Sequence, residues 1–348
     1  MSVDAARLDT PDKAQVITRG RLSHRFPIAM YIARRIVQGL LTAVIVSILI
    51  YVAITVLPSN VAQIVLGKDA TPERVAAIQH QLYQGQPVWE RYIHFFAHFL
   101  TGRFGYSSAG LVQGEHITVG SMIGPAFKNS AILAAITMIL FLPMMLTLGL
   151  LAGLKAGSTR DTAISVTSLT VSALPEFLVG TILIVVFFHW LRLLPPVSTV
   201  SPGLSPLATP NILILPIATL LLVSLAFGSR VLRASVAEIV ATDYVTYARI
   251  RGYSKWRVIW RYILPNALAP TVQIVAQQLQ YLIGGLVIVE SVFGYPGIGT
   301  VLVNAISVHD VQLVVVMTTI LAAIYILINV VADVIAILLD PRVRTRMG

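Results

Sequence analysis

The chain of 348 residues contains no cysteine, and charged residues make up only 11% of it. The absence of cysteine excludes disulfide bonds, thiolate metal ligands and cysteine nucleophiles. Because soluble proteins carry about 25% charged residues, a chain this poor in charge could not cover a water-exposed surface with polar groups. The phosphate-binding pattern GxxxxGK[ST] and the hydrolase patterns GxSxG and HExxH are also missing. The sequence therefore gives no support to ATP binding or to hydrolysis in this chain.

Apolar residues dominate what is present: 56% of the chain is hydrophobic, and its mean hydropathy is +0.82. A helix needs about 20 apolar residues to cross the hydrocarbon core of a membrane. Six long stretches with few or no charges meet that need: residues 36–57, 130–154, 163–190, 212–229, 270–289 and 311–339. We therefore predict an all-α polytopic membrane protein with six transmembrane helices.

Lysine and arginine outnumber the acidic residues by 25 to 15, which gives a net charge of +10. Nineteen of the 25 basic residues lie before the first stretch, after the last, or in the alternate loops that include residues 230–269. Cytoplasmic segments of membrane proteins carry such an excess, so we expect both termini and the 230–269 loop in the cytoplasm. The basic balance then reflects orientation and contact with the lipid bilayer, and we expect no nucleic acid partner.

Composition divides the chain into four parts. We expect residues 1–27 to form a flexible cytoplasmic tail, 28–57 the first transmembrane helix, 58–128 an extracytoplasmic segment, and 129–346 a core of five transmembrane helices. In the extracytoplasmic segment, apolar residues from Trp89 to Leu100 recur at helical spacing, as in a helix that lies along the membrane or under a partner. His94 and His98 lie four residues apart without an accompanying carboxylate, and we expect no metal site.

The loop of residues 230–269 is the most informative part of the chain. Residues 236–252 are compatible with a helix that ends at Gly252, a residue suited to a helix C-terminus. Residues 253–264 alternate aromatic and basic side chains before Pro265 interrupts the pattern. Trp256 and Trp260 lie four residues apart among basic residues, which suits a helix in the headgroup region of the bilayer.

Two acids and a glycine repeat stand out within or beside the apolar stretches. Glu176 follows Pro175 halfway along the third stretch, where it could serve a substrate pathway or a proton relay, or be a paired carboxyl at a proline-broken helix. Glu290 ends the fifth stretch on its outer side. Gly149, Gly153 and Gly157 recur every four residues, which predicts a face of close helix packing.

Since the sequence shows no ATP-binding or hydrolase motif, we interpret the chain as a passive translocation bundle with one elaborate cytoplasmic loop. A separate protein that docks on this loop would then supply the force. An ion-coupled secondary transporter is the alternative, although such proteins usually place ionisable or broken-helix groups in two corresponding repeats. We find no convincing internal repeat in the sequence. A membrane enzyme is a more distant alternative.

Several motifs in order along residues 28–346 give the sequence a specific resemblance. The segment 243–254, D-Y-V-T-Y-A-R-I-R-G-Y-S, followed by Pro265, resembles the EAA loop of binding-protein-dependent ABC importer permeases of the oligopeptide/dipeptide branch. Further segments resemble other motifs of that branch: Y-I-A-R-R at 31–35, G-R-F-G-Y-S at 102–107, Ser172, Pro175, Phe177 and Gly180 in the third stretch, E-S-V-F-G-Y-P-G-I-G at 290–299, and Asn329, Asp333 and L-D-P-R-V-R at 339–344.

The sequence departs from that branch or from the general motif at three places. Thr246 stands where the general EAA motif has glutamate, Arg103 replaces an acid in the motif at 102–107, and P-S-N at 58–60 stands where many members have P-G-D.

The resemblance implies the type I permease fold of ABC importers in a bacterial or archaeal cytoplasmic membrane. The loop would couple to an ATPase through Asp243, Tyr244, Thr246, Tyr247, Ala248, Arg249, Gly252 and Pro265, and the residues of a translocation pathway or gate would include Glu176, Glu290 and Gly297. The implied partners are a second, homologous permease subunit, two ATP-binding cassette subunits that hold ATP and Mg, and an extracytoplasmic solute-binding protein. No cofactor and no catalytic residue are expected in this chain.

The implied activity is ATP-driven import of dipeptides or oligopeptides by alternating access. Other members of the branch handle a nickel complex or glutathione, so these solutes are alternative substrates.

Overall fold

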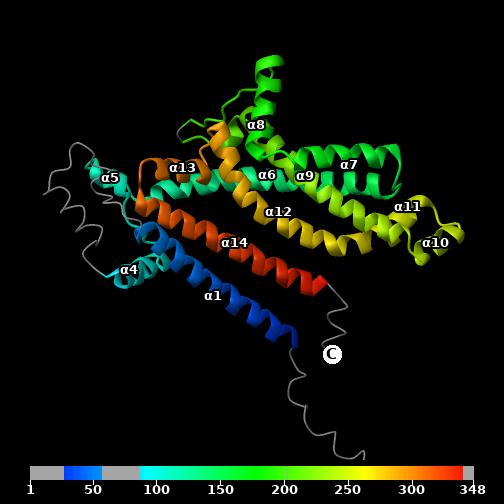
Figure 1. The fold of residues 1–348 in the computed structure, drawn as a ribbon, viewed down its shortest axis with the longest axis horizontal. Helices are drawn as coiled ribbons and strands as arrows, with labels where there is room; N and C mark the ends of the chain where they lie inside the picture. The colour runs from blue at the N-terminus through cyan, green and yellow to red at the C-terminus, as the bar shows by residue number, and fades with distance from the viewer. Residues whose placement is uncertain (1–26, 57–86, 202, 340–348) are drawn as a thin grey trace, which may run out of the picture.

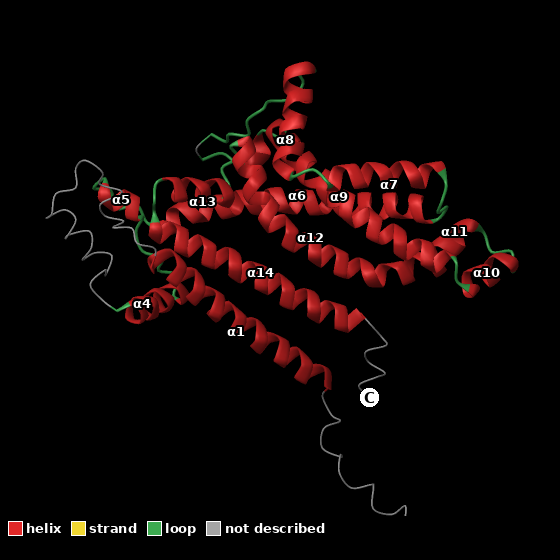
Figure 2. Ribbon diagram, viewed as in Figure 1, coloured by secondary structure: helices red, strands yellow, loops and turns green. Residues whose placement is uncertain are grey.

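The computed structural model describes residues 27–56, 87–201 and 203–339. Within these ranges the regular structure is helical, and extended pairing is limited to one antiparallel bridge between Tyr106 and Thr118 (Figures 1 and 2). The predicted tail, the motif departure at 58–60 and the end of the C-terminal motif from residue 340 lie outside the described residues.

Five long helices form the body of the protein. They are α1 (Pro27–Val56), α6 (Val119–Gly153), α9 (Asn211–Val240), α12 (Leu264–Phe293) and α14 (Val311–Leu339). Each of these five contains a segment long and apolar enough to cross a membrane, and a bent pair of helices would add a sixth span. The all-α polytopic fold class predicted from the sequence is therefore confirmed.

The third apolar stretch is broken next to Pro175, as the interpretation of Glu176 as a carboxyl at a proline-broken helix implied. It consists of α7 (Thr159–Ser172), α8 (Glu176–Ile184) and the π-helix η2 (Val185–Trp190), and the chain bends by 104° between α7 and α8. Pro175 precedes α8 with extended backbone angles. Proline lacks an N–H group and disfavours a helical residue before it, so the bend falls where the sequence places this residue. In Figure 1, α8 projects away from the direction of the long helices.

Short helices lie at the two ends of the long helices (Figure 1). One end carries α10 (Asp243–Ile250), α11 (Lys255–Val258) and the π-helix η4 (Ile259–Ile263), together with the start of α1 and the end of α14. The other end carries α4 (Val88–Leu100), α5 (Ser108–Val112) and α13 (Ile298–Ser307); the short 3-10 helix η3 spans Pro206–Ala208. This arrangement agrees with the expectation that both termini and the 230–269 loop share one side. That this side is cytoplasmic stays a prediction.

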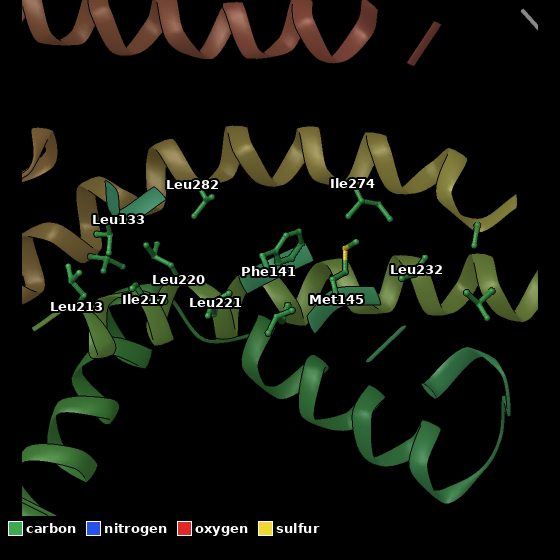
Figure 3. Packing of buried hydrophobic residues seen from close by; sticks show 14 of the residues in the cluster. Leu133, Phe141, Met145, Leu213, Ile217, Leu220, Leu221, Leu232, Ile274 and Leu282 are labelled. Atoms are coloured by element: carbon green, nitrogen blue, oxygen red, sulfur yellow. The ribbon is translucent and has the colours of Figure 1, made fainter. Parts of the chain in front are cut away.

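The hydrophobic core lies where α6, α9 and α12 meet (Figure 3). Leu133, Phe141 and Met145 of α6 pack with residues from Leu213 to Leu232 of α9. The predicted glycine face is confirmed at two positions, because a Cβ atom on Gly149 would lie 2.7 Å from the Leu232 side chain and one on Gly153 would lie 2.6 Å from that of Val236. Gly157 differs: it has a φ of +79° and belongs to the turn before α7.

An ion pair between a buried aspartate and a partly exposed arginine fixes α7 against α9. The Asp161 carboxylate, 3% exposed, accepts two hydrogen bonds from the Arg233 guanidinium at 2.8 and 2.6 Å and a third from the Gly157 N–H at 2.8 Å. A bidentate arginine–carboxylate pair combines strength with a fixed geometry. This pair therefore holds the last turns of α9, which lead into α10, against its neighbour.

Candidate functional site

The predicted coupling segment forms a short helix with one buried face. The predicted helix over 236–252 is interrupted, because α9 ends at Val240 and α10 begins at Asp243 after the cap residue Thr242. Val245 and Ala248 of α10 are buried at 0% and 3% exposure. Gly252 follows the helix with a φ of +76°, a conformation that glycine adopts without the Cβ penalty of other residues.

The other face of α10 is open. Ile250 and Tyr247 are 74% and 66% exposed, and Tyr244 is 41% exposed. The remaining predicted coupling residues Asp243, Thr246 and Arg249 are exposed as well. The exposed face of α10 thus carries aromatic, aliphatic and charged groups, while its opposite face packs against the bundle. This mixture of residues is the composition expected at the centre and rim of a protein interface.

Aromatic and basic side chains contact one another in the segment that connects α10 to α12. The Tyr253 and Tyr262 rings stack at 6.0 Å between centroids, and the Arg257 guanidinium lies 5.5 Å from the centre of the Tyr253 ring. The alternation of aromatic and basic residues ends at Pro265, but the helical backbone continues through this residue, because η4 leads directly into α12.

At the opposite end, Glu290 holds the start of α13. Its carboxylate is fully buried and accepts hydrogen bonds from the Ser130 hydroxyl of α6 at 2.5 Å and from the Gly299 N–H at 2.7 Å. The Ser130 oxygen in turn accepts the Ile298 N–H at 2.8 Å. The free N–H groups at a helix start need such acceptors, and a negative group there is favoured. Glu290 thus joins three helices: its own α12, α6 and α13.

The turn between α12 and α13 is also bound to α6. The Tyr295 hydroxyl donates to the Asn129 carbonyl at 2.8 Å, and the Asn129 side chain donates to the Pro296 carbonyl at 2.8 Å. A Cβ atom on Gly297 would overlap the Glu290 carboxylate, so only glycine fits this close approach. We call the turn formed by residues 290–299 and its contacts with Asn129 and Ser130 the outer hinge. The structure therefore brings Glu290 and Gly297 together.

Glu176 lies in a different place, at the first residue of α8 beside the bend. It lines a cavity of about 500 Å³ between α8, α12 and α14, whose other lining residues include Gln280, Tyr281 and Tyr325. The Tyr281 hydroxyl interacts with the Glu176 carboxylate, and Gly285 leaves room beside it, since a Cβ atom there would lie 3.4 Å from a carboxylate oxygen. Among the residues described, no lysine or arginine forms an ion pair with Glu176.

Another buried acid, Asp310, contacts the motif at residues 102–107. Asp310, 1% exposed, accepts hydrogen bonds from the Ser107 hydroxyl, from the Ser108 N–H at 2.9 Å and from the Leu313 N–H at 3.1 Å. It therefore fixes α5 to the start of α14 across 203 residues of sequence.

Sequence reasoning missed Ser130, Asp161 and Asp310 as positioning residues. Their partners lie 160, 72 and 203 residues away along the chain. A signal was present for Asp161, which follows Ser158 at the spacing of a helix N-terminus. A serine or aspartate at such a position predicts a local cap, but it does not predict a partner on another helix.

Comparisons with known proteins place these features in a family. Residues 145–345 match the family model described as "Binding-protein-dependent transport system inner membrane component", and residues 28–149 match the model for the N-terminal part of such membrane components. The chain therefore belongs to the family of binding-protein-dependent inner membrane components. It is an ABC importer permease component of the peptide branch, and a multi-pass inner membrane protein.

Individual relatives cover nearly the whole chain. The "Probable peptide ABC transporter permease protein y4tP" of Sinorhizobium fredii is 31% identical over 317 residues, which are 90% of this chain and 99% of that relative. The "Glutathione transport system permease protein GsiC" of Escherichia coli strain K12 is 28% identical over 318 residues, which are 90% of this chain and 98% of that relative. A protein of the same description from Salmonella typhi is 27% identical over 314 residues.

Proposed function

We propose that the chain is a translocation subunit that imports dipeptides or oligopeptides, driven by ATPase subunits that are separate proteins. The observation that carries this proposal is α10, a short helix with a buried inner face and an exposed face that includes Tyr247 and Ile250. The relative from Sinorhizobium fredii, whose name specifies a peptide, supports the substrate class. Glutathione, itself a small peptide, and a nickel complex are the alternative solutes.

In this proposal α10 receives the force of ATP hydrolysis. An ATPase subunit would cover Tyr247 and Ile250, while Val245 and Ala248 would transmit its movement to the bundle through their buried contacts. The Asp161–Arg233 pair supports transmission because it ties the end of α9 to α7. Paired movement of two ATPases would then switch the permease between inward-facing and outward-facing states. ATP and Mg²⁺ would be bound by those partners, and this chain would have no catalytic role of its own.

Glu176 is our candidate for a residue of the translocation pathway. Polar groups within apolar helices are costly unless they line an aqueous cavity or pair with one another. Glu176, Gln280 and Tyr281 meet at one cavity, where a carboxylate could receive the ammonium group of a peptide. Glu290 and Gly297 would act at a distance from it, as the hinge that positions α13 at the outer gate.

The proposed complex contains this chain, a second homologous permease, two ATP-binding cassette subunits and an extracytoplasmic solute-binding protein. It would reside in the cytoplasmic membrane of a bacterium or archaeon, with the α10 end of this chain in the cytoplasm.

Peptide uptake by the reconstituted complex tests the proposal. Proteoliposomes that contain all subunits and internal ATP should import a dipeptide or oligopeptide, and collapse of the proton gradient should leave the rate unchanged. Uptake that stops when the gradient collapses, with ATP maintained, would instead identify an ion-coupled secondary transporter.

A further inference from the structure

A cavity that the proposed transport mechanism does not use lies at the end opposite α10, between α4 and the facing ends of α1 and α14. Its volume is about 330 Å³. Its polar lining comes from α1, α4, α14 and the segment after α4, and consists of Tyr51, Arg91, His94, His98, Arg103, Tyr106 and Gln312.

The positions of two lining residues fix the depth of this cavity in the membrane. Tyr51 lies three residues before the end of the apolar span Ile32–Ile54, and Gln312 is the second residue of the span Val311–Ile335. Because a helix rises about 1.5 Å per residue, both side chains lie within one helical turn of the ends of their spans. The cavity is therefore at the level of the lipid headgroups.

The charge of the lining favours an anion. Arg91, Arg103 and two histidines line the cavity, and no aspartate or glutamate is among its described lining residues. The Arg91 Nε atom is buried and has no hydrogen-bond partner among the residues that the structure describes, while the Tyr51 hydroxyl interacts with the same side chain. A buried donor without an acceptor is unfavourable, and the guanidinium fork matches the oxygens of a phosphate.

The helix that carries Arg91 also carries groups suited to the acyl chains of lipids. Trp89, Ile93 and Leu100 of α4 are 67%, 62% and 70% exposed, and their spacing places them on one stripe of the helix. Tryptophan is enriched at membrane interfaces, and a helix with such a stripe lies in the interface with its apolar face toward the acyl chains. This stripe lies on the face of α4 opposite Arg91 and His98, because successive residues of a helix are about 100° apart. It would therefore hold α4 in the interface and leave the cavity face toward α1 and α14, at the depth of the lipid phosphates.

We propose that this cavity binds the phosphodiester group of an anionic phospholipid in the outer leaflet, with Arg91 and Arg103 as its main ligands. The bound lipid would fix α4 against α1 and α14. The absence of an acid from the described lining favours an anionic headgroup over a zwitterionic one, whose cationic end would gain no partner there.

Native mass spectrometry of the full-length chain in an uncharged detergent tests this proposal. With phosphatidylglycerol added, the wild-type chain should retain one tightly bound lipid and unfold at a higher temperature, and phosphatidylcholine should be retained less. The double substitution Arg91→Gln with Arg103→Gln should reduce the affinity for phosphatidylglycerol by about a hundredfold, the effect of losing two charge-assisted hydrogen bonds. The matched control is Arg160→Gln, an exposed arginine at the start of α7 outside this cavity.

The single substitution Arg103→Gln keeps the test independent of folding, because Arg103 is an exposed residue outside the regular helices. Reduced occupancy in this variant and unchanged occupancy in Arg160→Gln would support the proposal. Equal occupancy in wild type, Arg103→Gln and the double variant would overturn it. Stabilisation of the wild type by inorganic phosphate alone, equal to that by phosphatidylglycerol, would also overturn it, since a free anion would then be the ligand.

Discussion

The outer hinge and α10 are built in opposite ways. At the hinge, the Glu290 carboxylate is fully buried and its hydrogen bonds come from α6 and α13. On α10, Tyr247 and Ile250 are more than half exposed and contact between the helix and the bundle is confined to its inner face. The hinge is complete within this chain, whereas α10 presents a surface that a second protein would complete. Stability should therefore depend on the hinge, and association should depend on α10.

Glu290→Ala should have the largest effect on stability. The substitution removes the acceptor for the Ser130 hydroxyl and the Gly299 N–H in a buried site, at an expected cost of about 3 kcal/mol. Thermal unfolding in detergent measures the loss. The control is Glu115→Ala, an exposed acid at the same end of the protein. An unfolding temperature unchanged from wild type would contradict the role assigned to the hinge.

Gly297→Ala should destabilise the hinge somewhat less. The added methyl group would overlap the Glu290 carboxylate, and such overpacking costs about 2 kcal/mol. Gly124→Ala is the matched control, because a Cβ atom there meets no neighbouring atom within 4 Å. If the two variants unfolded at the same temperature, Gly297 would not be needed for close approach.

Gly252→Val should cost about 1 kcal/mol of stability through its left-handed backbone, yet it should abolish transport and weaken binding of the ATPase subunits. Gly203→Val offers a matched comparison, because Gly203 has a φ of +82° and, like Gly252, open space around it. Both variants should insert in the membrane, and only Gly203→Val should support uptake. Normal uptake by Gly252→Val would show that the conformation of Gly252 is not needed for coupling to the ATPase subunits.

Tyr247→Ser should change stability by no more than about 0.5 kcal/mol, as for surface positions generally. Association with the ATPase, measured by copurification, should nevertheless fall, because an exposed aromatic anchor is lost. Leu207→Ser, at a residue that is 57% exposed and precedes α9, serves as the control. Full copurification of the ATPase with Tyr247→Ser would show that this face of α10 is not the docking surface.

The sequence was sufficient for features that depend on local composition or spacing. Apolar length predicted the long helices, and the four-residue repeat predicted the close packing of Gly149 and Gly153 against α9. The αL conformation of Gly252 also agrees with its predicted place at a helix end.

Features that depend on partners distant in sequence could not be predicted. Pro175 was visible, but a 104° bend requires knowledge of what α8 packs against. The ion pair of Asp161 and Arg233 joins residues 72 positions apart, and each alone looks like an ordinary charged residue near the end of an apolar stretch. One sequence contains no signal that selects such pairs from the many that its composition allows.

The most direct test of the central claim uses the absence of cysteine from the chain. Thr246→Cys changes an exposed residue of α10 with little change in size and leaves Tyr247 in place. It would carry the only thiol of this chain, so a photoactivatable maleimide added before assembly would label this helix alone. In the assembled complex, irradiation should join this chain to an ATPase subunit, whereas the same label on Thr209→Cys, at the exposed residue before α9, should not. No ATPase adduct at position 246 in a transport-active complex, or equal adducts at both positions, would contradict the account.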